Sequence, residues 1–300
     1  MSYTTKPFEE LDIMDDFLMN ATAGDREVGE EFCRTLLRGL LQRELGQVQI
    51  SIQKVIFANA PNQRGIRLDI EVDELELCEK EIVVKNIFNI EPNKRKEVNL
   101  PRHNRFYQAK IDSRNLKSGE TDFIKLPNLF VITITDYDPF GYDYMMYTVH
   151  NQCQEIPNLE YEDGLFFIYF NTTGTKGGNS SIKSLLNFIQ DSKINNVTDE
   201  ITHRLHNCIS KVKISPELKE AYMRWEEKLF YERLDGKIEG KIEGKIEGKI
   251  EVIFDCLEEI GAIPEELREK IEKETDLEQI KKWLKVAMNV NSIEEFIEKM

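Results

Sequence analysis

The chain has 300 residues, of which 40% are hydrophobic and 32% charged, a mix typical of a globular protein with one sizeable core and an appendage. Its 55 Asp and Glu residues outnumber its 40 Lys and Arg residues, which gives a formal net charge of -15. Because such a charge repels polyanions, a general nucleic-acid coat protein is excluded, whereas a local basic stripe is not.

Targeting signals and cysteines both point to the cytoplasm. The sequence contains no run of eighteen apolar residues, so no membrane-spanning helix is expected, and the polar, acidic start lacks the apolar core of a secretion signal. The cysteines are odd in number and more than forty residues apart, which excludes a close-spaced metal motif and favours a reduced chain. They are Cys33, Cys78, Cys153, Cys208 and Cys256.

The first half of the chain reads as two helices followed by strands. Hydrophobic spacing predicts helices over residues 8–20 and 26–45, the second ending at Gly46. The period then changes to two, which predicts strands over 48–57, 66–73 and 82–90. The middle strand alternates apolar residues with mainly acidic ones, so one of its faces is acidic. Pro101 suits the first turn of a helix that runs to about residue 116.

The second half begins with strands and ends with helices. The pattern predicts strands over 129–134, 145–149 and 165–170 and helices over 180–191 and 198–210. A helix from Pro216 leads into four tandem Gly-Lys-Ile-Glu units at 236–251. A four-residue period makes the Ile stripe drift around the helix, and each Gly costs about 1 kcal/mol relative to Ala. This helix is therefore expected to be a projecting stalk or a self-associating element.

Three regions follow from these patterns: an α/β domain over 1–212, a long helix over 213–251 that links or self-associates, and a small helical region over 252–300. Three or four short helices are expected in the last region. Asp276 and Ser292 are good N-caps there, and Glu295 completes a capping box with Ser292.

Asp69 and Glu91 form the first candidate site, since both lie near strand ends on polar faces. If the two strands pair as an antiparallel hairpin, the carboxylates converge. Two oxygen ligands with open positions suit Mg²⁺ or Mn²⁺, which accept waters and phosphate oxygens. The alternative is that both acids are simply solvated on an exposed strand face.

A basic stretch follows directly, over residues 94–117. It holds eight Lys and Arg residues against two acidic ones, a net +6 within an acidic chain. Arg102, Arg105 and Gln108 recur every three residues and share a helix face, and Lys110 follows them. Cations placed after a pair of acids suit a phosphodiester substrate, although a solvated charged face remains an equal alternative.

Other constellations are weaker. His203 and His206 lie three apart on a predicted helix without further ligands, so a surface helix is favoured over zinc. Phosphate-loop, dinucleotide-binding and hydrolase-elbow motifs are missing from the sequence.

Several segments, in order, resemble the recombination-promoting nucleases of the Rpn type, also described as PD-(D/E)XK nuclease family transposases. The matching segments are IMDDFLMN, RGIRLDIEV, FNIEPNK, LPRHNRFYQAKIDSRNLKSGE, KLPNLFVITITDYDPFG and YEDGLFFIYFNTTGT, and the resemblance covers residues 8–210. It implies a restriction-endonuclease-like fold, a mixed sheet flanked by helices, that cuts DNA with a divalent metal and carries an all-helical C-terminal tail.

Site roles follow from the same resemblance. Asp69 matches the family's metal-binding aspartate and Glu91 its metal-binding glutamate. The third motif position, Lys or Gln in the family, is Asn93 here; Asn is shorter and uncharged, so positioning of the attacking water falls to Asn93 or to Lys94. Pro92 suggests a sheet edge or a bulge that re-aims these two residues. Further candidates are Gln108 as a supporting residue and Asp16, Glu30 or Glu31 as additional acids near the metal.

The expected function is that of a cytoplasmic, metal-dependent DNA endonuclease tied to recombination or mobile elements. Asp69 and Glu91 would hold Mg²⁺ or Mn²⁺, and Arg102, Arg105 and Lys110 would bind DNA phosphates. Two alternatives remain open: a nuclease fold that has lost its chemistry at Asn93 and binds nucleic acid or a partner, and an assembly role through the repeat helix, with a homo-oligomer as its product.

Overall fold

The computed structural model describes residues 6–56, 66–78, 81–116, 119 and 121–300. Phe57 and Lys117, which the predicted first strand and the basic stretch include, lie outside this set. The chain forms two compact units, Met1–Tyr222 and Met223–Met300. None of the helices within the described ranges combines the length and the apolar character needed to cross a membrane.

A six-stranded mixed sheet forms the centre of the first unit, with the strand order β1-β2-β3-β4-β6-β5. Strands β1, β2 and β3 are antiparallel neighbours, β3, β4 and β6 run parallel to one another, and β5 is antiparallel to β6. The strands are β1 (Gln47–Ile56), β2 (Ile66–Cys78), β3 (Glu81–Asn93), β4 (Asn128–Thr135), β5 (Met146–Val149) and β6 (Leu165–Asn171). The predicted α/β class with a mixed, helix-flanked sheet is confirmed.

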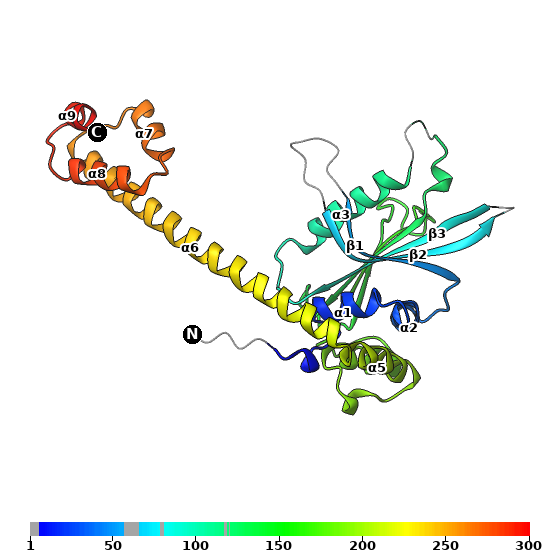
Figure 1. The fold of residues 1–300 in the computed structure, drawn as a ribbon. Coiled ribbons are helices and arrows are strands. Elements are labelled where there is room, and N and C mark those ends of the chain that lie inside the picture. Colours follow the sequence, from blue (N-terminus) through cyan, green and yellow to red (C-terminus); the bar gives the residue numbers. More distant parts are fainter. Residues whose placement is uncertain (1–5, 57–65, 79–80, 117–118, 120) are drawn as a thin grey trace. The chain divides into compact units, whose positions relative to one another are not determined.

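Helices cover both faces of this sheet (Figure 1). Helices α1 and α2 lie on one side with α5 beneath them, and α3, which follows β3 in the chain, lies on the other side. The elements are η1 (Phe8–Glu10), α1 (Asp16–Ala23), α2 (Gly29–Leu41), α3 (Leu100–Asn115), η2 (Phe123–Lys125), α4 (Ser180–Gln190), η3 (Ile194–Asn196) and α5 (Glu200–Lys213).

Alternation determines the burial of β2 from Ile70 to Val72, whereas Ile66 and Leu68, earlier in the strand, pack in the cluster of Ile111. Ile70 pairs with Ile90 and Val72 with Phe88, and all four side chains are fully buried on one face. On the opposite face, Ile111 of α3 packs against a cluster from β2, β3 and β4. The predicted acidic face of β2 is therefore not left to solvent: Glu71 is completely buried there, because α3 covers that side of the sheet.

Three local expectations are corrected in whole or in part: the helix expected over residues 8–20 is a short 3-10 turn, Phe8–Glu10, followed by α1, and at Pro92 the sheet edge is right but the bulge is not. Helix α2 ends at Leu41 rather than near residue 45, because Gln42 adopts a left-handed conformation with φ 54° and caps the Gly39 carbonyl through its own amide. Pro92 makes no bulge, since the parallel register with β4 continues unbroken from Glu91 to Asn93. The lost N–H of Pro92 is tolerated because pairing with β2 already ends at Ile70 and Ile90.

The second unit is helical, as predicted. Helix α6 (Pro216–Ile260) contains all four repeats and continues past residue 251, and it is followed by α7 (Glu265–Glu272), α8 (Leu277–Ala287) and α9 (Ile293–Lys299). Ile253, Leu257, Trp283 and Phe296 contribute to a separate apolar core.

The helix caps of this unit follow the sequence in part. The side chain of Asp276 accepts a hydrogen bond from the backbone of Glu278, and that of Ser292 accepts one from the backbone of Glu295. The carboxylate of Glu295 bonds to the backbone of Asn291, one residue before the cap, so the predicted capping box is only half formed.

Candidate functional site

The candidate site begins where the β2–β3 hairpin stops pairing. The antiparallel ladder ends with Ile70 opposite Ile90, so Asp69 and Glu91 are the next residues on the two strands. The backbone N–H of Asp69 donates to Oε1 of Glu91 at 3.5 Å. The carboxylate of Glu91 therefore takes the place of the next backbone acceptor, and the hairpin brings the two acids together.

A third acid, Asp16, adds its charge to this pair. Asp16 is the first residue of α1, and its charge raises the pKa of both Asp69 and Glu91. Burial is the larger cause of the raised pKa of Asp69, and for Glu91 burial is followed by the charge of Asp69. Burial also raises the pKa of Asp16. Of the three acids proposed for this role, Asp16 is the one whose charge the pair feels.

The negative charges of these three acids repel one another. Arg67 is the cation that opposes the shift at Asp69, and neither Asp69 nor Glu91 has an ion pair in the part of the chain that the structure describes. Buried carboxylates without a cation are stabilised either by a proton or by a bound cation. The site is thus suited to take up one or the other.

The donor set limits which cation could bind. Among the described residues, no group of three or more His, Cys, Asp or Glu side chains is arranged to hold a metal. A closed structural zinc site is thereby unsupported in this part of the chain. Two carboxylates that leave the remaining positions to water and to substrate oxygens correspond to the usual coordination of Mg²⁺ in phosphate chemistry.

Lys94 is already paired in the structure. Its ammonium bonds to Oδ1 of Asp15, and Lys6 bonds to Oδ2 of the same carboxylate at 2.8 Å. Although burial raises the pKa of Asp15, these two hydrogen bonds lower it overall. Lys94 thus lies on the α1 side of the site, where it neutralises Asp15 rather than the Asp69–Glu91 pair.

Asn93 is also bonded away from the acids. Its amide oxygen accepts from the backbone of Arg95 at 3.0 Å and from the hydroxyl of Tyr137 at 3.3 Å, and its amide nitrogen donates to Glu97 at 3.5 Å. These bonds tie Asn93, the last residue of β3, to the turn that leads to α3, so the structure does not join it to Asp69.

Helix α3 is tied to the strand beside Glu91. Asn104 donates to the hydroxyl of Thr133 at 2.9 Å, and Thr133 is the β4 residue paired with Glu91. The hydroxyl of Tyr107 contacts the carbonyl oxygen of Arg67, two residues before Asp69, at 3.4 Å. The first turns of α3 are therefore fixed next to the acidic pair.

The predicted contacts to DNA and the predicted supporting residue all lie on α3. Arg102 and Arg105 are exposed and Lys110 is half-buried, and no ion pair involves the three within the described ranges; Lys110 lies over the ring of Phe106 at 5.7 Å. Gln108 donates to Asp112 one turn further along the same helix. The structure thus leaves three cations available to solvent but gives Gln108 no contact with Asp69 or Glu91.

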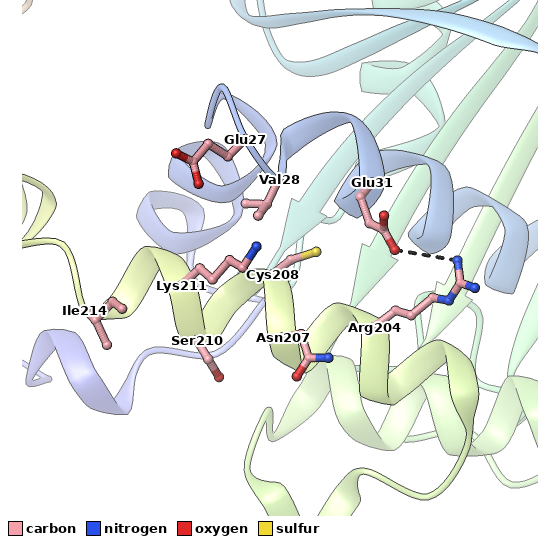
Figure 2. Close-up of a pocket in the computed structure, with 9 residues that line it drawn as sticks. All are labelled: Glu27, Val28, Glu31, Arg204, Asn207, Cys208, Ser210, Lys211 and Ile214. Carbon is pink, nitrogen blue, oxygen red and sulfur yellow. Dashed lines mark ion pairs between the residues drawn. The ribbon is translucent and has the colours of Figure 1, made fainter.

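Glu30 and Glu31 lie elsewhere. Glu30 pairs with Arg34 at 2.8 Å on α2, and Glu31 pairs with Arg204 of α5 at 3.5 Å. Figure 2 shows Glu31 and Arg204 on opposite sides of a cavity of about 550 Å³ between α2 and α5, into which Cys208 and Lys211 also project. Neither glutamate is joined to the acids of β2 and β3.

A second buried polar cluster lies further along the hairpin, and sequence reasoning did not assign it. Glu71 pairs with Lys54 of β1 and with Arg114 of α3, the latter at 2.7 Å. Asn89, opposite Glu71 in the ladder, is fully buried and donates to Glu91 at 3.4 Å. The alternation of β3 places Asn89 on the same face as Glu91, and this spacing in the sequence could have indicated that the two side chains are neighbours.

Comparisons with known proteins add no relative: no protein-family model, curated protein or solved structure matches the chain. What the chain can do is therefore judged from its own side chains and from the motifs that they form.

Proposed function

We propose that the first unit is a restriction-endonuclease-like nuclease of the recombination-promoting type, which hydrolyses DNA phosphodiester bonds with Mg²⁺ or Mn²⁺. The observation that carries this proposal is the pair of half-buried carboxylates, Asp69 and Glu91, which are joined at the open end of a hairpin and have no ion pair among the residues that the structure describes. A carboxylate with a purely structural role would be expected to have a cationic partner within the fold, as Glu71 has in Arg114.

The residues fit a divalent metal. Both acids offer hard oxygen ligands, and the repulsion that raises their pKa is relieved when a cation is bound between them. Such an ion polarises the phosphoryl group and makes water a stronger nucleophile at neutral pH. Asp69 and Glu91 would hold it, and Asp16 would add negative charge nearby.

The substrate side is supplied by α3. Because Asn104 and Tyr107 anchor this helix beside Glu91, the exposed Arg102 and Arg105 and the half-buried Lys110 are available to bind backbone phosphates near the acids. Because these basic residues are grouped on one helix, they can attract DNA locally although the whole chain has a net charge of -15. A role in recombination or transposition follows from the family resemblance.

A second candidate is a nuclease fold that binds nucleic acid or a partner without cutting. The specific observation in its favour is that both residues expected to position water are engaged elsewhere, Lys94 by Asp15 and Asn93 by Tyr137. Catalysis would require Lys94 to exchange Asp15 for the reacting phosphate, whereas binding through α3 would not.

Cleavage of supercoiled plasmid in Mg²⁺, in Mn²⁺ and in EDTA tests the first candidate. Nicking is expected only with metal, and Asp69→Asn is expected to reduce its rate about 100-fold or more, since charge stabilisation of several kcal/mol is lost. Asp73→Asn, further along β2, is the matched control and should keep the activity. Cleavage in EDTA, or by the Asp69→Asn protein, would contradict the mechanism.

Titration calorimetry with Mg²⁺, combined with gel shifts on DNA, separates the two candidates. The nuclease is expected to bind metal in the wild type and not in Asp69→Asn. DNA binding that persists without any metal binding would favour the binding module instead.

A further inference from the structure

A second cavity lies at the start of β4 and β6, away from the carboxylate pair. It has a volume of about 740 Å³ and is lined by Phe130 of β4, Phe166 of β6 and the loop over residues 150–164. The acids of the candidate site lie toward the other end of these parallel strands, where Glu91 of β3 pairs with Thr133 near the end of β4. The cavity is thus a separate feature of the same sheet.

The chain around this cavity carries charge of one sign. Residues 126–175 contain seven Asp and Glu residues and neither Lys nor Arg. Asp163 is used internally, since it accepts from Asn151 at 2.6 Å and from the backbone of Leu165 at 3.1 Å. Glu160 and Glu162 also line the cavity, are exposed, and have no ion pair within the described part of the chain.

The wall of the cavity is the end of an aromatic ladder. Phe88, Phe130 and Phe166 are register neighbours on β3, β4 and β6, and their rings stack with centroids 5.0 and 4.8 Å apart. Phe88 is fully buried, whereas Phe130 and Phe166 are half-buried and line the cavity. The ladder therefore has one closed end and one end that a ligand can reach.

The closed end shows which ligand such a ladder accepts. There the guanidinium of Arg43 lies over the ring of Phe88 at 5.3 Å and pairs with Glu74 at 2.9 Å. A guanidinium is well suited to this setting because it stacks on an aromatic face while it bonds to a carboxylate. The open end offers the same two components, aromatic rings and the carboxylates of Glu160 and Glu162, without the cation.

The loop beside the cavity also exposes apolar side chains, which points to a protein segment rather than a free small cation. Ile156, Leu159 and Tyr161 lie on this loop and are 56%, 47% and 57% exposed. Aromatic and apolar anchors beside unpaired charge are typical of protein–protein contacts. A nucleic acid is disfavoured at this surface because the carboxylates repel phosphates.

We propose that this cavity binds an arginine side chain from a basic segment of a partner protein, the guanidinium stacking on the open end of the ladder beside Glu160 and Glu162. The inference does not depend on nuclease activity, since it uses none of the residues of that site.

Calorimetry with the full chain tests the proposal. The probe is a ten-residue alanine–glycine peptide that carries two adjacent arginines, and the same peptide with citrulline in place of arginine keeps the shape without the charge. The wild type is expected to bind the arginine peptide at least tenfold more tightly than the citrulline peptide. Glu160→Gln with Glu162→Gln should weaken arginine-peptide binding at least tenfold, and Phe166→Leu at least threefold.

The matched control is Glu294→Gln with Glu298→Gln, two exposed acids of the second unit, which changes the net charge equally. It should change peptide binding less than twofold. Equal weakening by both double variants would show non-specific attraction to an acidic chain and would overturn the proposal. Concentration-dependent dimerisation in sedimentation, abolished by Glu160→Gln with Glu162→Gln, would assign the cavity to a second copy of this chain and would also overturn it.

Discussion

The β2–β3 hairpin carries two acidic groups that differ in how their charge is balanced. Glu71 is fully buried and pairs with Lys54 and Arg114, so the fold itself supplies its cations. Asp69 and Glu91, at the end of the same hairpin, are half-buried; burial raises the pKa of each, as do the charge of Asp69 for Glu91 and the charge of Asp16 for both. Uncompensated charge of this kind is tolerated where a proton or a ligand can relieve it, which is why the second group, and not the first, is the candidate site.

The largest effect is expected from breaking the balanced group. Arg114→Ala leaves the buried Glu71 with Lys54 alone, and it should lower the free energy of unfolding by about 3 kcal/mol, because a buried carboxylate loses one of its two cationic partners. Urea unfolding followed by circular dichroism measures the change. Arg105→Ala, on the exposed side of the same helix, should change stability by less than about 0.5 kcal/mol. Equal stability of both variants would mean that Glu71 does not need its ion pair.

Adding a divalent ion is expected to stabilise only the unbalanced group. A ligand present at about 100 times its dissociation constant raises the free energy of unfolding by about 2.7 kcal/mol, so Mg²⁺ or Mn²⁺ should raise the melting temperature of the wild type. Thermal unfolding in EDTA and in Mn²⁺ measures the shift. Asp69→Asn should abolish it and Arg114→Ala should keep it; a shift of the same size in Asp69→Asn would place the ion elsewhere.

The sequence was enough to predict that Asp69 and Glu91 meet, and it missed the other contacts of the hairpin for a physical reason. Alternating residues and the hairpin direction were enough to bring Asp69 to Glu91, since both depend on local period and neighbouring strands. The contributions of Asp16 and of the Lys94–Asp15 pair depend on how α1 packs against the sheet. Local pattern also could not show that α3 buries Glu71, because an acidic strand face looks the same whether solvent or a helix covers it.

Removing one charge from the Asp69–Glu91 pair should raise the free energy of unfolding, whereas Arg114→Ala lowers it. The pKa of Glu91 is raised in the folded state, mainly by burial and then by Asp69, so the native state holds a proton more tightly than the unfolded chain. Stability is then complete below the ordinary pKa of about 4.3 and falls as the pH rises through the raised value. In EDTA at high pH, Glu91→Gln should therefore be more stable than the wild type by about 2 kcal/mol.

The measurement for Glu91→Gln is urea unfolding at several pH values, with and without Mn²⁺. The two proteins should converge at low pH, and Mn²⁺ should reverse their order at high pH by stabilising only the wild type. A destabilised Glu91→Gln protein in EDTA at every pH would mean that Glu91 has a structural role.

Asp73 lies between the two cases, and the smallest effect is expected there. Burial, followed by the charge of Glu71, raises its pKa to about 6, and among the described residues its buried Oδ1 has no hydrogen-bond partner. Lys54 and Arg114 oppose this shift, so Asp73 shares the cations of Glu71 without pairing with them. Because its pKa is raised, Asp73 makes the native state lose stability as the pH rises from about 4 to about 6. Asp73→Asn should therefore be more stable than the wild type above pH 6. The expected gain is about 1 kcal/mol, since solvent screening reduces the full effect. Urea unfolding at pH 4 and pH 7 measures this difference. A gain in the free energy of unfolding that is confined to pH 7 would show that the cations of the hairpin balance one acid and not two. An equal gain at both pH values would mean that the effect comes from packing rather than from charge.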